Sequence, residues 1–298
     1  MTETNCQILL PVRDYNLDAT LTSGQAFRWQ KRDDGWEGVI GNRWVHLSTS
    51  APGITATTSR PCTDWSWLTH YLQADVVLDD ILKTFPEDEP LGASVAACRG
   101  LRLLRQDPWE CLASFICSST KQIVQIQQII ALLCQRHGEH LTAATNTPAY
   151  SFPTAAQIAS LSEAELRACK MGFRAPYLRA AAQAIQGGGT DLDQLRTLPY
   201  ELAQTSLVSL PGVGTKIANC VLLFAYGFAG AFPVDVWIMK ALRELYFPKR
   251  RPTPARLQKF VASYFGPHAG YAQQYLFHFM RTRGKVSLVE TRAKVTPE

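Results

Sequence analysis

The first sixty residues alternate short apolar runs with turn residues, a pattern typical of β-strands. Runs rich in Ile, Val, Trp and Thr lie at residues 7–12, 27–30, 38–40, 43–47 and 54–58. Turn signals separate several of them, because Asp33 and Asp34 precede Gly35, and Gly41 precedes Asn42. The pattern predicts an antiparallel, β-rich N-terminal lobe.

From residue 64 onward the apolar positions follow a helical period, with repeated signals for helix starts. Asp107 stands as an N-cap, with Pro108 at the first helical position and Glu110 at the third. Ser162 and Glu165 have the spacing of a second capping box. These signals predict a mainly helical body.

Together the two patterns predict an α+β protein in three parts. Residues 1–100 form the β-rich lobe with flanking helices, residues 101–285 form the helical body, and residues 286–298 form a polar tail.

Composition agrees with a compact protein, since 46% of the 298 residues are hydrophobic and 18% are charged. No stretch approaches the roughly 18 apolar residues that a membrane helix needs. The first residues lack a basic segment followed by an apolar run. We therefore expect an intracellular protein that does not interact with membranes.

Charge is distributed unevenly along the chain. The first 100 residues carry 8 basic and 13 acidic side chains, whereas the rest carry 22 and 12. From Arg243 onward there are 11 basic and 3 acidic residues. Such a field would attract a polyanion such as nucleic acid, and a solvated basic face is the alternative.

The eight cysteines show no Cys-x-x-Cys spacing and lie mostly in apolar runs, at positions 6, 62, 98, 111, 117, 134, 169 and 220. This usage indicates buried thiols in a reducing compartment. Zinc ribbons and iron–sulfur clusters need grouped cysteines, so we expect no metal site.

The segment 207–220, LVSLPGVGTKIANC, has an apolar helix end, a Gly-rich turn and a second amphipathic helix. This pattern predicts a helix–hairpin–helix within the helical body. Gly212 and Gly214, on either side of Val213, free the backbone for a tight turn whose N–H groups can approach a phosphate. An ordinary helix–helix turn is the alternative.

Lys216 follows the hairpin directly, in the first turn of the new helix. The positive end of a helix disfavours a protonated amine, so this lysine is placed to become a nucleophile. A simple phosphate contact is the alternative role. Nineteen residues later, Asp235 stands at the N-cap of another helix, where capping alone would also explain it.

The hairpin and the segment around Asp235 resemble the helix–hairpin–helix glycosylases that carry a Gly/Pro-rich loop and an aspartate. Further segments resemble the 8-oxoguanine DNA glycosylase branch of that superfamily, in chain order: SGQAFRW (23–29), LLRQDPWEC (103–111), SFICSS (114–119) and GYAQQYLF (270–277). The similarity extends from about residue 7 to residue 280.

The resemblance implies a repair enzyme that flips a damaged guanine out of duplex DNA and cleaves its glycosidic bond. Lys216 would attack C1′ and leave a Schiff base that permits β-elimination. Asp235, kept ionised by its capping hydrogen bonds, would stabilise positive charge on the sugar. Such an enzyme needs no cofactor, and we expect a monomer whose partner is duplex DNA containing oxidised guanine.

The resemblance also implies the pocket for the flipped base. The carbonyl of Gly24 would accept the N7–H that distinguishes 8-oxoguanine from guanine, and Gln273 would read the Watson–Crick edge. Phe277 and Cys220 would lie on the two faces of the base. Without the resemblance, Gln273 and Phe277 would be interpreted as a helix face in the core, and Cys220 as a buried thiol.

Several positions depart from the family pattern. Thr120, Lys121 and Gln122 replace three asparagines, and Gln125 replaces an arginine, of a group that holds the orphaned cytosine in relatives. Phe173 replaces the tyrosine that wedges into the duplex, while its neighbour Arg174 is kept as a possible cytosine contact. Trp237 replaces a phosphate-binding histidine. We therefore expect a weaker preference for cytosine opposite the lesion.

Three alternatives remain. Adenine-mismatch and endonuclease-III-like enzymes would show a C-terminal four-cysteine cluster, which this sequence lacks, and alkyl-base glycosylases usually lack the hairpin lysine. A non-catalytic DNA-binding protein of the same fold would need neither Lys216 nor Asp235, and both are present.

Overall fold

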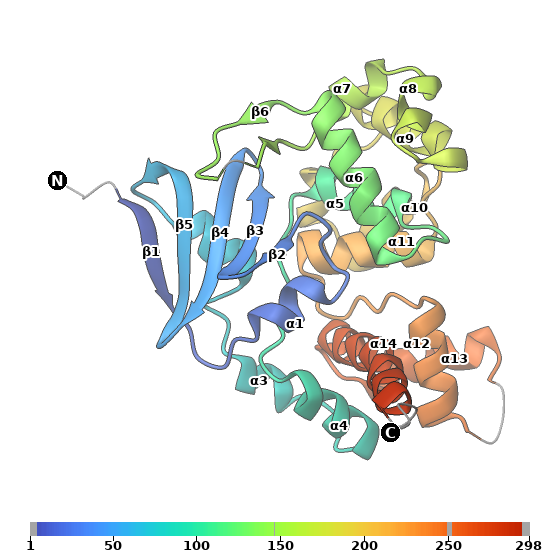
Figure 1. Cartoon of the computed structure of the whole chain (residues 1–298). Helices are drawn as coiled ribbons and strands as arrows, with labels where there is room; N and C mark the ends of the chain where they lie inside the picture. Colours follow the sequence, from blue (N-terminus) through green and yellow to red (C-terminus); the bar gives the residue numbers. More distant parts are fainter. Residues whose placement is uncertain (1–4, 146, 249–251, 294–298) are drawn as a thin grey trace.

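A five-stranded antiparallel sheet forms one side of the computed structural model, which describes residues 5–145, 147–248 and 252–293 (Figure 1). The strands pair in the order β1-β5-β4-β3-β2. Their bounds are β1 (Asn5–Pro11), β2 (Gln30–Arg32), β3 (Gly35–Ile40), β4 (Arg43–Ser50) and β5 (Gly53–Cys62). The predicted β-rich lobe is confirmed.

Tight turns join β2 to β3 and β3 to β4 at the places that the sequence predicts. Arg32 pairs with Gly35 across the first turn, and Ile40 pairs with Arg43 across the second. The strand expected at residues 27–30 is wrong, because only Gln30 belongs to β2. Phe27 instead packs edge-on against Phe115 of the helical body, 5.5 Å away, and is buried there.

The N-terminal part has four helices: α1 (Leu17–Thr22), α2 (Ser66–Leu72), α3 (Leu78–Leu82) and α4 (Glu89–Cys98). The buried hydrophobic residues of α3 and α4 belong to the core of the helical body, where α4 packs against α14 (Ala269–Ala293). Helix α1 lies between the sheet and the helical body (Figure 1). Alternate residues of β4 and β5, such as Leu47 and Ala56, are fully buried beneath α2 residues such as Leu68.

The rest of the chain is mainly helical, as predicted, with a minimal two-stranded sheet of β6 (His140–Leu141) and β7 (Ala149–Tyr150). The α-helices are α5 (Pro108–Cys117), α6 (Ile123–His137), α7 (Ala155–Ser160), α8 (Glu163–Ala168), α9 (Ala175–Gln186), α10 (Tyr200–Val208), α11 (Thr215–Val221), α12 (Val236–Ala241), α13 (Pro254–Tyr264) and α14 (Ala269–Ala293). Two 3-10 segments, η1 (Gly172–Arg174) and η2 (Gln194–Thr197), precede α9 and α10. Two π-helical segments, η3 (Leu222–Tyr226) and η4 (Leu242–Tyr246), continue α11 and α12.

Both predicted N-caps are confirmed. The Asp107 carboxylate accepts a hydrogen bond from the Glu110 amide at 2.8 Å, and Ser162 forms a capping box with Glu165. Within the three described ranges, no helix is long and apolar enough to cross a membrane.

Helix α14 continues to Ala293, into the segment 286–298 for which we expect a polar tail. Residues 286–293, VSLVETRA, contain neither Gly nor Pro, so nothing in them stops the helix. Residues 294–298 lie outside the described residues. The division between lobe and body at residue 100 stays a prediction.

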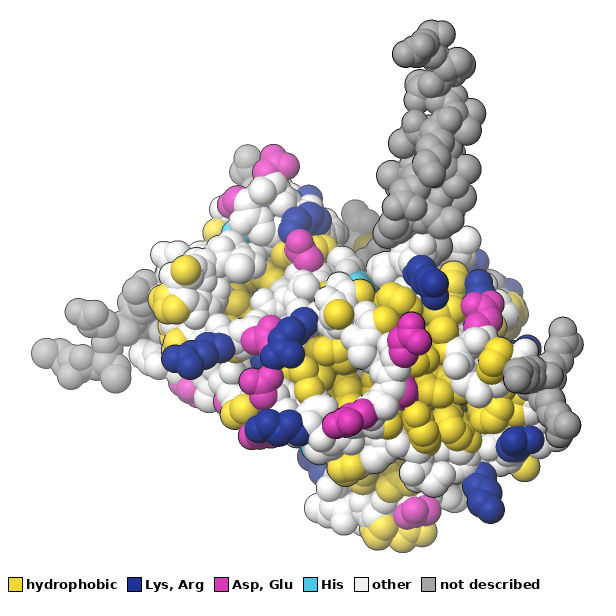
Figure 2. Space-filling view, turned by 90° about the horizontal axis from the view of Figure 1, so that it is seen from below, with side chains coloured by type: hydrophobic (Ala, Val, Ile, Leu, Met, Phe, Trp, Pro, Cys, Tyr) yellow, Lys and Arg dark blue, Asp and Glu magenta, His cyan; other side chains and the backbone are white. Residues whose placement is uncertain are grey.

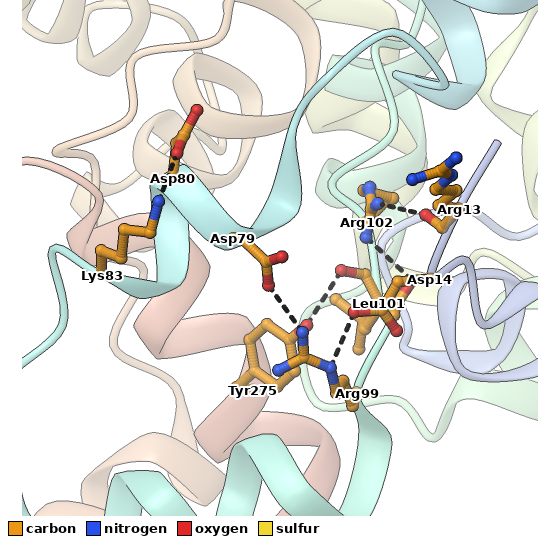
Figure 3. Close-up of polar contacts among 10 residues, drawn as sticks. Arg13, Asp14, Asp79, Asp80, Lys83, Arg99, Leu101, Arg102 and Tyr275 are labelled. Carbon is orange, nitrogen blue, oxygen red and sulfur yellow. Dashed lines mark hydrogen bonds and ion pairs between the residues drawn. The ribbon is translucent and has the colours of Figure 1, made fainter.

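Polar contacts connect α3, α4 and α14 to the chain that links the sheet to the body (Figure 3). Arg99 forms ion pairs with Asp14 at 2.7 Å and with Asp79 at 2.6 Å. Tyr275 of α14 donates to the Leu101 carbonyl at 3.2 Å. These contacts surround residues 101–106, which pass between the two parts of the molecule.

A buried amide fixes residues 20–25 to that linking segment. Gln25 is fully buried, and its Nε2 donates to the carbonyl oxygens of Thr20 and Arg102, at 3.0 and 2.8 Å. Its Oε1 accepts from the Leu104 amide at 2.8 Å. Nε2 also donates to Oγ of Ser23 at 3.0 Å. Because the other three partners are buried backbone groups, the side chain substitutes for water that cannot reach them.

We expect Gln25→Leu to lower the free energy of unfolding by about 3 kcal/mol, because several buried backbone groups lose their partners together. Urea denaturation measures the loss. Gln30→Leu is the matched control, since Gln30 is exposed on β2 and its side chain bonds to the half-buried Arg32 among the described residues. Equal stability of the two variants would contradict this role for Gln25.

Candidate active site

The helix–hairpin–helix is formed by α10, residues 209–214 and α11. Gly212 has φ of +78°, and a Cβ atom there would lie 2.6 Å from Cβ of Tyr177. The Val213 amide donates to the Leu210 carbonyl at 3.1 Å and closes the turn. Only glycine fits residue 212, for both reasons. Gly212 and Gly214 are exposed, so the turn is accessible from solvent.

Lys216 is half-buried in the first turn of α11. Its Nζ donates to Oγ of Ser118 at 3.3 Å and lies 5.4 Å from the centre of the Phe115 ring. Ser118 donates its own proton to the Phe115 carbonyl at 2.7 Å, which leaves its oxygen free to accept from the lysine. Neither of these partners is a carboxylate, so within the described parts of the chain the amine is held without a close ion pair.

Asp235 caps α12, as predicted. Its Oδ1 accepts from the amides of Trp237 at 3.0 Å and Ile238 at 2.8 Å. Burial nevertheless raises the pKa of Asp235 above its ordinary value, although the capping bonds and the charge of Lys216 act in the opposite direction. Desolvation is the largest of these effects on the pKa, and the capping bonds act against it. The expectation that Asp235 is held as a carboxylate by its capping bonds stays a prediction.

The structure places Lys216, Asp235 and Cys220 in one electrostatic neighbourhood. Burial raises the pKa of the Cys220 thiol to about 11, while the charge of Lys216 lowers it and that of Asp235 raises it. Lys216 and Cys220 lie one turn apart on α11, and Asp235 approaches from the start of α12. The amine of Lys216 and the carboxylate of Asp235, which are 19 residues apart in sequence, therefore both lie close enough to the Cys220 thiol to influence its pKa.

The predicted base-pocket residues also converge. Gly24 has φ of +77°, and a Cβ atom there would lie 3.3 Å from Cε1 of Phe277 and 2.8 Å from Cδ1 of Ile123. Gln273 lies one turn before Phe277 on α14 and is buried. Among the described residues its Oε1 has no hydrogen-bond partner. An unpaired buried acceptor is costly, and a ligand would satisfy it.

A cleft of about 720 Å³ lies between the sheet and α6 and reaches Gly24. Lys216, Asp235 and Gln273 do not line it. A smaller hollow of about 560 Å³ borders Asp235 and continues along α12 past Lys240 and Arg243. The geometry of the side chains, rather than cleft size, therefore locates the site.

Three residues expected to contact DNA lie together. Phe173 is 54% exposed, and the guanidinium of Arg174 lies 4.2 Å from the centre of its ring. Arg174 itself is buried, and its Nη2 donates to the carbonyl of Ser119 and, at 2.6 Å, to Oγ1 of Thr120. Arg174 therefore holds Ser119 and Thr120 in place, and the Phe173 ring extends into solvent.

The substituted positions have roles of their own. Oε1 of Gln125 accepts from the amide of Gln122 at 3.1 Å, so Gln125 caps α6. Trp237, in place of the family's histidine, is half-buried, with Nζ of Lys240 5.9 Å from its ring centre.

Sequence reasoning gave no role to Ser118, Tyr177 or Ile123. Ser118 was visible as part of the SFICSS segment, but its contact with Lys216 spans 98 residues of sequence. Nothing in the sequence indicates that Tyr177 and Ile123 pack against the two critical glycines.

Basic side chains are interspersed with acidic and apolar ones on the face seen in Figure 2, so the described residues show no single basic patch there. Part of the basic C-terminal composition, including Lys249, Arg250, Arg251 and Lys294, lies outside the described residues. Among those described, no group of three His, Cys, Asp or Glu side chains is placed to hold a metal ion.

Comparison with known proteins gives consistent matches along most of the chain. Residues 7–112 match the N-terminal domain of 8-oxoguanine DNA glycosylase, and residues 113–267 match the HhH-GPD superfamily of base excision DNA repair proteins. The N-glycosylase/DNA lyase OGG1 of Arabidopsis thaliana is 32% identical, over 89% of this chain and 77% of that protein.

Two solved structures are also similar. MBOgg1 in complex with a low-affinity DNA ligand has a TM-score of 0.89 and 31% identity, covering 95% of this chain and 98% of that one. The 8-oxoguanine glycosylase/lyase of Clostridium acetobutylicum, in complex with double-stranded DNA containing cytosine opposite 8-oxoguanine, has a TM-score of 0.86 and 28% identity. That match covers 92% of this chain and 94% of the other.

Asp235→Asn tests the effect of burial on the carboxylate. Because the folded pKa of Asp235 is raised above 3.8, its contribution to stability is greatest at acid pH and falls as the pH rises through that folded pKa. The amide does not titrate. We therefore expect the stability of the variant, relative to the unmodified protein, to increase between about pH 4 and about pH 7. Urea denaturation at both pH values measures this change.

Asp107→Asn is the matched control, since Asp107 caps α5 but is exposed. It should lose a few tenths of a kcal/mol at neutral pH, through a weaker interaction with the helix dipole. A similar loss in Asp235→Asn would mean that capping outweighs burial at Asp235.

Proposed function

Because this chain belongs to the 8-oxoguanine DNA glycosylase family of the HhH-GPD superfamily, we propose that it excises 8-oxoguanine from duplex DNA and then cleaves the abasic strand. It is a bifunctional DNA N-glycosylase and AP lyase. The observation that supports this most directly is the amine of Lys216, held without a close ion pair in the same neighbourhood as the half-buried carboxylate of Asp235.

The first step is displacement of the base. The unprotonated Nζ of Lys216 forms a bond to C1′, and the C1′–N9 bond breaks with its electron pair leaving on the base. Positive charge develops on the sugar as that bond lengthens, and the carboxylate of Asp235 stabilises it. Partial burial strengthens this interaction, because little water screens it.

The second step is strand cleavage. The sugar ring opens to give a Schiff base between Lys216 and C1′, which makes the C2′ proton acidic. Removal of that proton expels the 3′ phosphate by β-elimination, and hydrolysis of the imine then releases the lysine.

Recognition of the base rests on hydrogen bonds that guanine does not make. The carbonyl of Gly24 accepts the N7–H of 8-oxoguanine, whereas guanine presents a lone pair at N7. The unpaired Oε1 of Gln273 accepts from the Watson–Crick edge. Phe277 and Cys220 lie on the two faces of the flipped base.

Duplex DNA is the partner, bound by a monomer inside the cell. The exposed turn around Gly212, Val213 and Gly214 approaches a phosphate, and Phe173 enters the duplex beside the extruded nucleotide. Thr120 and Arg174 lie on the side of the orphaned base. The glycosylase/lyase of Clostridium acetobutylicum, which was solved with such a duplex, supports this assignment.

Lys216→Gln should abolish base release while leaving duplex binding intact, because the hairpin backbone is unchanged. Borohydride reduction on a duplex with 8-oxoguanine opposite cytosine should trap a covalent adduct with the unmodified protein and none with the variant. Trapping at an unchanged level would assign the nucleophile to another amine.

Lys83→Gln is the control for this experiment, since Lys83 is an exposed lysine that pairs with Asp80 (Figure 3). We expect Lys83→Gln to form the covalent adduct with DNA at the same level as the unmodified protein. Asp235→Asn should retain its fold and lose most of its excision activity, which separates catalysis by Asp235 from capping.

We expect the protein to discriminate only weakly between the bases that can lie opposite 8-oxoguanine. Thr120 is bonded to Arg174, and Gln125 is used to cap α6, so few donors are free to face cytosine. We expect a modest preference for cytosine over adenine opposite the lesion, which decreases further in Arg174→Ala. Single-turnover excision on the four opposite-base duplexes measures this. A preference above about a hundredfold, unchanged in Arg174→Ala, would show that another residue reads the base.

A further inference from the structure

Residues 22–25 present four consecutive backbone carbonyl groups beside the candidate active site, and side chains occupy three of them. Arg281 donates from Nη2 to the carbonyl of Thr22, and Gln274 donates to that of Ser23 at 2.9 Å. Gln106 donates to the carbonyl of Gln25 at 2.7 Å. Within the described residues, the Gly24 carbonyl accepts no hydrogen bond and is the one left for a ligand.

Arg281 differs from the other two donors, because its side chain is a cation and is partly removed from solvent. It lies on α14 one turn after Phe277 and two turns after Gln273. Its Nε is buried without a hydrogen-bond partner among the described residues, and burial lowers the pKa of the guanidinium. No carboxylate in the described chain pairs with it. A partly buried cation without such a partner lowers the stability of the fold, so a functional role would explain why it is placed here.

Both contacts of Arg281 lead to the base pocket. Its Cζ lies 5.7 Å from the centre of the Phe277 ring, and its Nη2 binds the carbonyl two residues before Gly24. The same ring closes on Gly24, where a Cβ atom would be 3.3 Å from Cε1. One guanidinium therefore restrains both the ring proposed to cover the base and the loop that carries the discriminating carbonyl.

We propose that Arg281 is a positioning residue for selectivity, which orients the Gly24 carbonyl and the Phe277 ring toward 8-oxoguanine. This inference rests on the proposed function. A single carbonyl distinguishes N7–H from an N7 lone pair only if it cannot rotate away, because a mobile peptide would relieve the repulsion that excludes guanine. Gly24, at a φ of +77°, has no Cβ atom to restrict its backbone rotation, so the loop needs an external restraint.

The experiment separates base recognition from lysine chemistry. Single-turnover excision of 8-oxoguanine opposite cytosine is compared with β-elimination on a preformed abasic site, which needs no base pocket. We expect Arg281→Met to slow excision by about tenfold to a hundredfold, the effect of losing an oriented, charge-assisted hydrogen bond. Cleavage of the abasic duplex should stay within about twofold, because Lys216 does not contact Arg281.

Arg283→Met is the matched control. Arg283 lies on the same helix with its guanidinium 5.6 Å from the Phe279 ring, but it is exposed and has no contact with residues 22–25. It should excise 8-oxoguanine at the unmodified rate. Arg281→Lys should recover part of the lost rate, since lysine can donate to Thr22 but lacks the planar group that covers Phe277. If Arg281→Met does not fold, the lysine variant alone tests the proposal.

Three results would overturn the inference. Excision at the unmodified rate in folded Arg281→Met or Arg281→Lys would show that the loop needs no restraint from this residue. An equal loss in excision and abasic cleavage would indicate general damage to the fold. An equal loss in Arg283→Met would indicate an effect of charge. Failure of the unmodified protein to excise 8-oxoguanine would instead refute the proposed function, and the two failures are therefore distinguishable.

Discussion

The buried amide of Gln25 is the interaction on which the geometry of the site depends. It joins residues 20–25 to the segment 101–106, which passes between the sheet and the helical body. Gln106 returns a hydrogen bond to the carbonyl of Gln25 and completes the connection. Most of these partners are buried backbone groups, so a partly formed network would be very costly. The position of Gln25 is therefore well defined, and the chain that carries Gly24 starts from a fixed point.

Lys216 and Asp235, the proposed catalytic pair, show how a fold can retain an unfavourable charge where the proposed chemistry needs one. Capping would favour an ionised Asp235, but burial raises its pKa, so the carboxylate is less stable in the folded protein than in water. Lys216 compensates part of this cost at a distance, and Ser118 holds the amine without neutralising it. The pair is less stabilised by its surroundings than a salt bridge would be, which keeps both groups available for a substrate.

Phe173, Arg174 and Thr120, which we propose to lie beside the orphaned base, are held differently from the proposed base pocket. Arg174 uses its donors on Ser119 and Thr120, and its plane lies against Phe173. This arrangement supports an exposed aromatic ring rather than a set of free donors. Insertion of Phe173 would hold the duplex open through stacking, which is tolerant of sequence, whereas reading a base requires hydrogen bonds that face it.

The sequence alone determined features that depend on neighbouring residues. The caps at Asp107 and Ser162, the hairpin around Gly212, and the positions of Lys216 and Asp235 at the starts of helices follow from spacing within one or two turns. The tertiary structure decided which of these features meet. The bond from Arg281 to Thr22 spans 259 residues of sequence, and no local pattern encodes such a contact. The expected strand at Phe27 was wrong, and the sequence did not show that desolvation acts against the capping bonds of Asp235. Both have one reason. Burial arises from the packing of distant segments, and burial decides both where an apolar run goes and how much a charge costs.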